Sequence, residues 1–134
     1  MKFFFDNCVP WRWAQALACL LENEGYEIVA LRSKYRENTS DESWMTSLGQ
    51  EGGWNVISGD FRIITNRQRR VVWTASKLTT FFLQSSWMND AYTETFKTAR
   101  FLSRWDEIAA IAEKSEPGTP FQLPFKGKIR RITF

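Results

Sequence analysis

The residues best suited to chemistry in this chain are four acids, Asp6, Asp41, Glu42 and Asp60. Asp6 and Asp60 each follow a short apolar run, whereas Asp41 and Glu42 open a segment with helical features. Carboxylates that lie close together repel each other, so a group of them binds a cation or shares protons. Ligands that are all oxygen favour Mg²⁺ or Mn²⁺. The chain contains no His, which excludes His-ligated metal sites and the commonest general base.

A divalent metal ion makes the missing His unimportant for one reaction class. Such an ion lowers the pKa of a bound water and stabilises the attacking and leaving oxygens of a phosphodiester. Each acid also has a plain structural explanation, because Asp6 and Asp60 could form turns. Asp41 and Glu42 equally suit the first turn of a helix, where the helix dipole favours negative charge. Their order and spacing along the chain favour the metal site.

Short apolar runs alternate with segments of helical spacing, which is the pattern of an α/β fold. The predicted strands are 2–5, 27–31, 54–58 and 78–83. The predicted helices are 10–23 and 66–76, together with a helix that begins at 41 and ends at the glycines before 54. A strand, a helix and a second strand in succession predict a right-handed parallel crossover. The carboxyl ends of parallel strands lie at one edge of the sheet, where α/β proteins bind ligands. We therefore expect the acids to meet there.

The second half of the chain carries the strongest helical signal. Apolar residues from Asp90 to Lys114 recur at helical spacing and predict one long helix. Prolines and glycines from Pro117 onward predict an irregular stretch. The tail, 126–134, alternates basic and apolar residues and suits either an edge strand or a surface arm. Loops or short connections are predicted at 32–38, 61–65 and 85–89.

Length and composition indicate one domain with an aromatic core. The chain has 134 residues, of which 16% are aromatic, and a formal net charge of +3. We expect a single domain over 1–134, with about 115–134 as a C-terminal extension. Its two Cys are too few for a disulfide scaffold. No signal-peptide pattern and no apolar run of about 20 residues is present, so we expect a cytoplasmic protein that does not contact a membrane.

Three motifs resemble the PIN-domain family, in particular the short PIN-like proteins of bacterial toxin–antitoxin operons. Phe3–Pro10 resembles the opening apolar strand with its acid and following Pro, Asp41–Trp44 resembles the second acidic position, and Val56–Arg62 resembles the strand that ends in a third acid. The resemblance covers roughly residues 1 to 112. It implies a three-layer α/β/α fold with a central, mostly parallel sheet. It also implies Mg²⁺- or Mn²⁺-dependent cleavage of RNA.

The resemblance also implies roles for the acids. Asp6 would be the first metal ligand and Asp60 the third, and either Glu42 or Asp41 would be the second. Glu42 is preferred because its longer side chain can reach inward. Many members of the family carry a fourth acid or an Asn shortly after the third, but segment 61–66 holds no acid. An Arg or Asn of this segment would take that place, which bears on whether one metal or two is bound.

Cleavage of RNA also needs groups that hold phosphates and bases. The candidates for contact with RNA are Asn7, Lys34, Tyr35, Arg36, Arg62 and Arg67, with Arg69 and Arg70 as further cations beside Arg67. These charges equally suit a solvated surface. The resemblance further implies a homodimer and a cognate antitoxin as partners. Trp11, Trp13 and Trp87 are candidates for exposed aromatic contacts.

Two other functions compete with the ribonuclease. A catalytically degenerate PIN-like module would bind RNA or protein without cutting, and the missing fourth acid favours it. A receiver-like or flavodoxin-like phosphate switch would also place acids at strand ends. Such a switch needs a Lys after a late strand, whereas Lys77 precedes the fourth strand. The phosphate switch is therefore the weakest of the three.

Overall fold

The computed structural model describes residues 1–134 and contains one six-stranded sheet. Its strands are β1 (Lys2–Phe5), β2 (Glu27–Ala30), β3 (Trp54–Ser58), β4 (Thr79–Leu83), β5 (Pro120–Leu123) and β6 (Arg130–Arg131). They lie in the order β2-β1-β3-β4-β5-β6. All neighbouring pairs are parallel except β5 with β6, so the expected mostly parallel sheet is confirmed.

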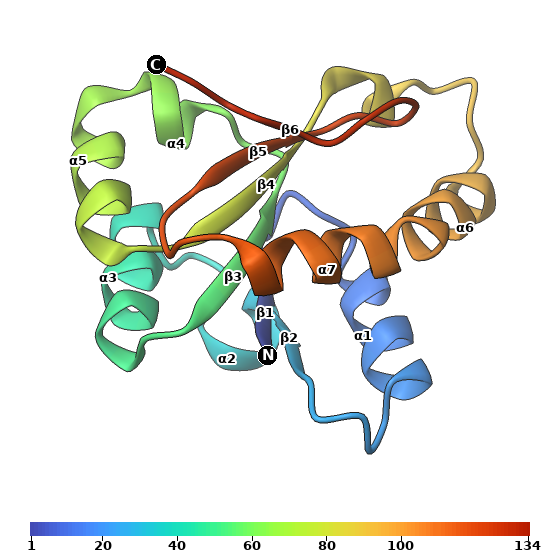
Figure 1. Cartoon of the computed structure of the whole chain (residues 1–134), viewed down its shortest axis with the longest axis horizontal. Coiled ribbons are helices and arrows are strands. Elements are labelled where there is room, and N and C mark those ends of the chain that lie inside the picture. The colour runs from blue at the N-terminus through green and yellow to red at the C-terminus, as the bar shows by residue number, and fades with distance from the viewer.

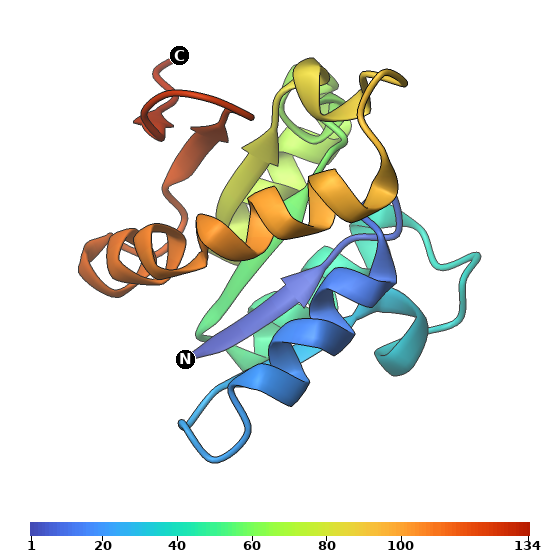
Figure 2. The same cartoon turned by 90° about the vertical axis from the view of Figure 1, so that its right-hand side faces the viewer.

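Helices cover both faces of this sheet (Figure 1; Figure 2 shows the molecule from the side). They are α1 (Trp11–Leu20), α2 (Leu31–Lys34), α3 (Asp41–Glu51), α4 (Arg62–Thr65), α5 (Arg67–Ser76), α6 (Glu94–Ser103) and α7 (Trp105–Lys114), with a 3₁₀ helix, η1 (Ser85–Met88). Helices α1, α6 and α7 pack on one face, and α3, α4 and α5 pack on the other. This is the predicted three-layer α/β/α fold. No helix is long and apolar enough to cross a membrane.

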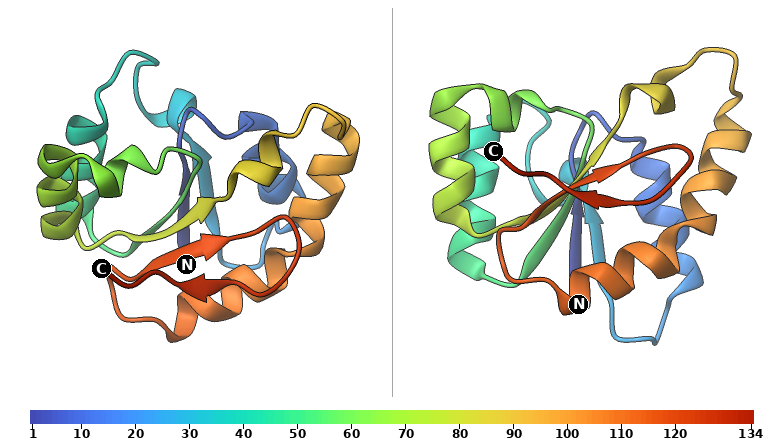
Figure 3. Two further views of the ribbon diagram at one scale, coloured as in Figure 1. Left: turned by 90° about the horizontal axis from the view of Figure 1, so that it is seen from above. Right: turned by 45° about the horizontal axis from the view of Figure 1, so that its top comes forward.

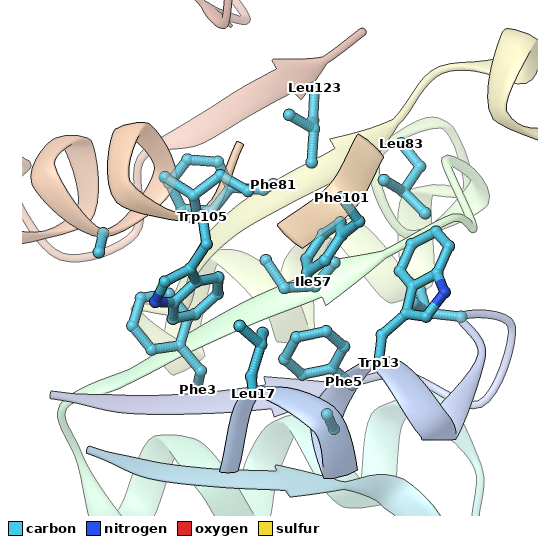
Figure 4. Close-up of a cluster of buried hydrophobic side chains, with 14 of the residues drawn as sticks. Phe3, Phe5, Trp13, Leu17, Ile57, Phe81, Leu83, Phe101, Trp105 and Leu123 are labelled. Atoms are coloured by element: carbon cyan, nitrogen blue, oxygen red, sulfur yellow. The ribbon is translucent and has the colours of Figure 1, made fainter. Parts of the chain in front are cut away.

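The three aromatic residues of β1 bind the layers together. Side chains alternate along a strand, so Phe3 and Phe5 enter the core beneath α1, α6 and α7, whereas Phe4 enters the opposite core. All three are fully buried. Figure 4 shows Phe3 and Phe5 among the buried aromatic residues of their cluster, which include Trp13. Trp13 is therefore a core residue, as is Trp87, and the expectation that both are exposed is wrong.

The predicted single helix over 90–114 is wrong, because the structure has two helices that meet at Arg104. Arg104 both ends α6 and precedes α7, and its side chain is buried. Its guanidinium donates to the backbone oxygens of Pro124 and Gly127, each at 2.6 Å, and to Glu107 Oε2 at 3.1 Å. Arg104 itself has right-handed helical backbone angles, so the helical spacing of apolar residues continues across the junction. Arg104 thereby ties the helix junction to the segment between β5 and β6.

Replacing Arg104 by Ala is expected to lower the free energy of unfolding by about 2–3 kcal/mol, because the substitution removes hydrogen bonds from a buried charged donor to two backbone carbonyls. Urea unfolding followed by circular dichroism measures this change. Glu107→Gln is the matched control, since it keeps the contacts to Pro124 and Gly127. It should cost less than about 1 kcal/mol. Equal losses in the two variants would contradict this role for Arg104.

The irregular stretch expected after Pro117 is wrong for Pro120–Leu123, which form β5 inside the sheet. Pro120 is the first residue of that strand and Pro124 follows it, and prolines are tolerated at such positions. The tail forms the short edge strand β6, which was one of its two predicted structures. Three predicted loops or connections contain a single helical turn each, namely α2, α4 and η1. Turns this short are hard to predict from the spacing of apolar residues.

Candidate functional site

The carboxyl ends of β1 and β3 place Asp6 beside Ser58. Phe5 pairs with Ile57 in the parallel register, and the Asp6 N–H continues the ladder by donating to the Ile57 oxygen at 2.9 Å. The next residue of β3 is Ser58. Figure 3, left, looks onto this end of the strands from above the view of Figure 1. Parallel pairing therefore brings the two predicted acidic positions, Asp6 and Asp60, to one edge.

Asp6 is a buried carboxylate with several donors, and only 5% of its surface is exposed. Oδ2 accepts from the Ser58 hydroxyl at 2.8 Å, and Oδ1 accepts from the Asn7 N–H at 2.6 Å. Burial raises the pKa of Asp6 above its ordinary value, and the nearby charge of Asp41 adds to this rise, although the hydrogen bonds oppose it. The carboxylate is thus held in place, and a cation near it would be stabilising.

Cys8 lies against the same carboxylate. Its thiol donates to Asp6 Oδ2 at 3.5 Å, and its sulfur accepts from the Gly59 N–H at 3.1 Å. Burial of the sulfur and the Asp6 charge raise the pKa of the Cys8 thiol to about 12, although the residue as a whole is exposed. The thiol therefore stays protonated at neutral pH and acts as a donor.

Asp60 is joined to Asp6 through Ser58, because the Asp60 N–H donates to Ser58 Oγ at 3.0 Å. Both Asp60 oxygens also face Arg62, which donates from Nε at 2.8 Å and from Nη2 at 2.9 Å. These bonds to Arg62 hold the pKa of Asp60 below its ordinary value. The side chain of Arg62 is 72% exposed, so little besides Asp60 holds it in place.

Asp41 enters from the first turn of α3, whose N-cap Ser40 accepts from the Ser43 N–H at 3.1 Å. Asp41 Oδ1 accepts from the Trp44 indole at 3.1 Å, and Oδ2 lies 3.4 Å from Arg69 Nε. Burial raises the pKa of Asp41, and the charge of Asp60 adds to the rise. Asp41 is therefore close enough to Asp60 for their charges to interact.

The three aspartates line one groove of about 300 Å³. Its other lining residues come from the turn after β1, from α2 and the loop that follows it, and from α4: Asn7, Cys8, Leu31, Glu37, Thr39 and Arg62. Glu42 does not line this groove. Its carboxylate lies 3.5 Å from Arg69 Nε, and its side chain is 43% exposed. The structure thus brings Asp6, Asp41 and Asp60 together and leaves Glu42 at the side.

The donor atoms of this groove suit Mg²⁺ or Mn²⁺ in kind, since they are carboxylate oxygens. As the side chains stand, however, no three His, Cys, Asp or Glu residues converge closely enough to hold an ion. Asp60 and Asp41 instead face the guanidinium groups of Arg62 and Arg69. A metal ion would therefore require these two carboxylates to exchange their arginine partners for the ion.

Four of the residues proposed for RNA contact lie outside the acidic groove. Lys34 pairs with Glu51 at 3.1 Å, and the Tyr35 hydroxyl donates to Ser47 at 2.8 Å. Arg36 and Arg67 are exposed and form no ion pair. Asn7 and Arg62 do line the groove.

Ser58, which connects Asp6 and Asp60, was not predicted from the sequence. Its signal in the sequence was a polar residue at the end of a buried parallel strand. Because Phe5 pairs with Ile57, the register of β1 and β3 places the next residue, Ser58, beside Asp6. Arg69 could likewise not be distinguished from its basic neighbours in the sequence. The helical position of Arg69, three residues after the N-cap Asn66, turns it toward α3, but only the packing of α3 on α5 shows this.

Asp6→Asn is expected to stabilise the fold at pH 7, because it removes a buried charge. Folding raises the pKa of Asp6, so the ionised carboxylate costs stability at neutral pH. This cost declines as the pH falls through the raised pKa, where the folded carboxyl group takes up a proton, and it is gone once the unfolded chain is protonated as well. Urea unfolding of both proteins from pH 3 to 7 tests this. A gain that stays constant over that range would contradict burial as its cause.

The geometry defines an α/β/α domain with an acidic groove at the carboxyl ends of its parallel strands. A family model described as a PIN like domain matches residues 1–85. The chain therefore belongs to the PIN-like domain family. The matched part contains β1 to β4 and all four acids, whereas α6, α7, β5 and β6 lie beyond it. No curated protein matches the chain, and no solved structure matches it.

Proposed function

We propose that this protein is a metal-dependent endoribonuclease that cleaves phosphodiester bonds of RNA. The observation that carries the proposal is the groove in which Asp6, Asp41 and Asp60 meet at the carboxyl ends of β1 and β3. Membership of the PIN-like domain family supports it. Mg²⁺ or Mn²⁺, once bound, would supply an activated water and stabilise charge on the phosphate oxygens.

The residues of the groove divide this work. Asp6, Asp41 and Asp60 would hold the metal, and Asp41 replaces Glu42 as the preferred second ligand because only Asp41 lines the groove. Ser58 positions Asp6 by donating to Oδ2 and also fixes the backbone of Asp60. Arg62, when released from Asp60, would be free to contact the phosphate at the groove.

Cleavage by the wild-type chain tests this function. A labelled single-stranded RNA should be cut in Mg²⁺ or Mn²⁺ and left intact in EDTA, because chelation removes the ion that the carboxylates hold. Equal cleavage in EDTA would show that a contaminant or another chemistry is responsible. A panel of structured RNAs extends the test if the first substrate is not cut, and no cleavage of any of them would contradict the proposal.

The arginines favour a second candidate, a degenerate PIN-like module that binds RNA or protein without cutting. Arg62 holds both oxygens of Asp60, and Arg69 lies within 3.5 Å of Asp41 and Glu42. In such a module these cations would permanently replace the metal. Arg62→Gln separates the two candidates in a Mn²⁺ titration. The nuclease predicts binding that is retained or tightened in the variant, whereas the degenerate module predicts no binding in either protein.

We further propose that the ribonuclease is the toxin of a toxin–antitoxin pair, restrained by a cognate antitoxin and active as a homodimer in the cytoplasm. The support is the resemblance of its acidic motifs to the short PIN-like toxins. Expression in a bacterial host should arrest growth, and Asp6→Asn should relieve the arrest. Light scattering should give twice the chain mass of 15.7 kDa. Normal growth with the wild-type chain would contradict the toxin role.

A further inference from the structure

A second, larger cavity lies beside the acidic groove. It has a volume of about 640 Å³ and is bounded by the ends of β4 and β5, by η1 and by the tail. The residues that matter here are Phe61, Gln84, Gln122, Arg130 and Arg131, and no acidic residue lines the cavity. Cavities of this size commonly hold a ligand as large as a nucleotide.

The two arginines of β6 supply unneutralised positive charge. Arg130 and Arg131 are exposed and form no ion pair or side-chain hydrogen bond. Arg62, Arg69 and Arg104, by contrast, all face carboxylates. Guanidinium groups without a carboxylate partner suit phosphate, which they can hold through two parallel hydrogen bonds.

Arg131 extends this positive path into a neighbouring cavity of about 530 Å³. That cavity is lined by Arg70 and Phe134 as well, and the Arg70 guanidinium lies 4.1 Å from the centre of the Phe134 ring. Basic and aromatic residues of α5 and the tail therefore line this neighbouring cavity as well. This combination is typical of surfaces that follow a single-stranded nucleic acid.

Phe61 connects the cavity to the acidic groove. It follows Asp60 directly and is 44% exposed although it is large and apolar. Its ring stands nearly perpendicular to that of Phe82, with ring centres 5.5 Å apart. Phe82 thus supports the Phe61 ring while part of that ring remains open to solvent. An exposed aromatic ring can stack on an unpaired base, which is not accessible within a duplex.

We propose that this cavity binds a nucleotide of single-stranded RNA next to the bond that is cut, with its base on Phe61 and its phosphates on Arg130 and Arg131. The proposal rests on the proposed ribonuclease function and adds a substrate site to it. The site depends on β5 and β6, which lie beyond the part of the chain that matches the family. It is therefore a feature of this chain that membership of the family does not supply.

Binding measured without cleavage tests the cavity. Fluorescence anisotropy in EDTA would follow a labelled oligouridylate of about 12 nucleotides. Arg130→Gln combined with Arg131→Gln should weaken binding about tenfold or more, and should lower the slope of log affinity against log salt by about 1.4. Phe61→Ala should weaken it about tenfold as well. The matched control is Lys126→Gln combined with Lys128→Gln, which removes two exposed charges from the same tail and should change the affinity less than about threefold.

Equal losses in the arginine pair and the lysine pair would overturn the proposal, because they would show that net charge alone holds the RNA. The absence of oligouridylate binding by the wild-type chain would also overturn it. Cleavage that persists with unchanged affinity in the arginine variant would reject this cavity and leave the nuclease intact. Selective loss of binding in a chain that cuts no RNA would reject the nuclease and support the cavity. Circular dichroism confirms that each variant is folded.

Discussion

Asp6→Asn is expected to reduce the rate of Mg²⁺- or Mn²⁺-dependent RNA cleavage by about a thousandfold or more. The substitution keeps the size of the side chain and an oxygen that can accept from Ser58, but it removes the charge that would hold the metal. Asp6 is the buried aspartate of the groove and is held there by Ser58, so no other group can take its place. Initial rates with a labelled single-stranded RNA measure the loss.

Asp41→Asn and Asp60→Asn should reduce the rate in the same way, because both aspartates line the groove with Asp6. Glu42→Gln is the matched control, since Glu42 neighbours Asp41 in α3 but does not line the groove. It should lower the rate less than about threefold. A loss for Glu42→Gln as large as that for Asp41→Asn would contradict the assignment of Asp41 as the second ligand. The predicted stabilisation by Asp6→Asn separates lost chemistry from lost folding.

Phe101→Ala is expected to lower the free energy of unfolding by about 3–5 kcal/mol. Phe101 is fully buried on the inward face of α6, and its ring stacks on Trp13 with centres 4.6 Å apart. It also meets Phe5 at 5.6 Å and Trp105 at 6.3 Å. The truncation removes these contacts and leaves a cavity, and domains are typically stable by only about 5–15 kcal/mol.

Phe96→Ala is the matched control for this effect. Phe96 lies on the same helix but is 49% exposed, so its loss should cost about 1 kcal/mol. Urea unfolding gives both values, and equal slopes with denaturant would show that the two variants unfold in the same manner. A cost for Phe96→Ala equal to that for Phe101→Ala would contradict the location of the core.

Much of the fold could be predicted because local sequence and tertiary structure agree in the first half of the chain. Strands β1 and β3 begin and end where their apolar runs do, and Asp6 and Asp60 meet because parallel strands share one edge. The break at Arg104 could not be predicted, since it depends on carbonyls from a segment some twenty residues later. Strand β5 was obscured by the prolines at its two ends, which are usually loop signals.

The choice between Asp41 and Glu42 also required the structure. Both acids stand in the first turn of α3 and suit the helix dipole equally, so sequence alone offers only the length of their side chains. The orientation of α3 against α5 directs the shorter one into the groove. The pairing of Asp41 with Arg69 was equally hidden, because Arg69 looks like its neighbours until α5 is packed against α3. Charge pairing between distant segments is set by tertiary packing, which spacing along the chain does not show.

The central claim is that Asp6, Asp41 and Asp60 form one divalent metal site. The most direct test is Mn²⁺ binding to the wild-type chain, followed by electron paramagnetic resonance, with Asp6→Asn and Glu42→Gln in parallel. A metal site of these three aspartates predicts saturable binding to the wild-type chain, nearly unchanged binding to Glu42→Gln, and loss of binding in Asp6→Asn. Absence of binding to the wild-type chain, or binding that survives Asp6→Asn, would contradict it.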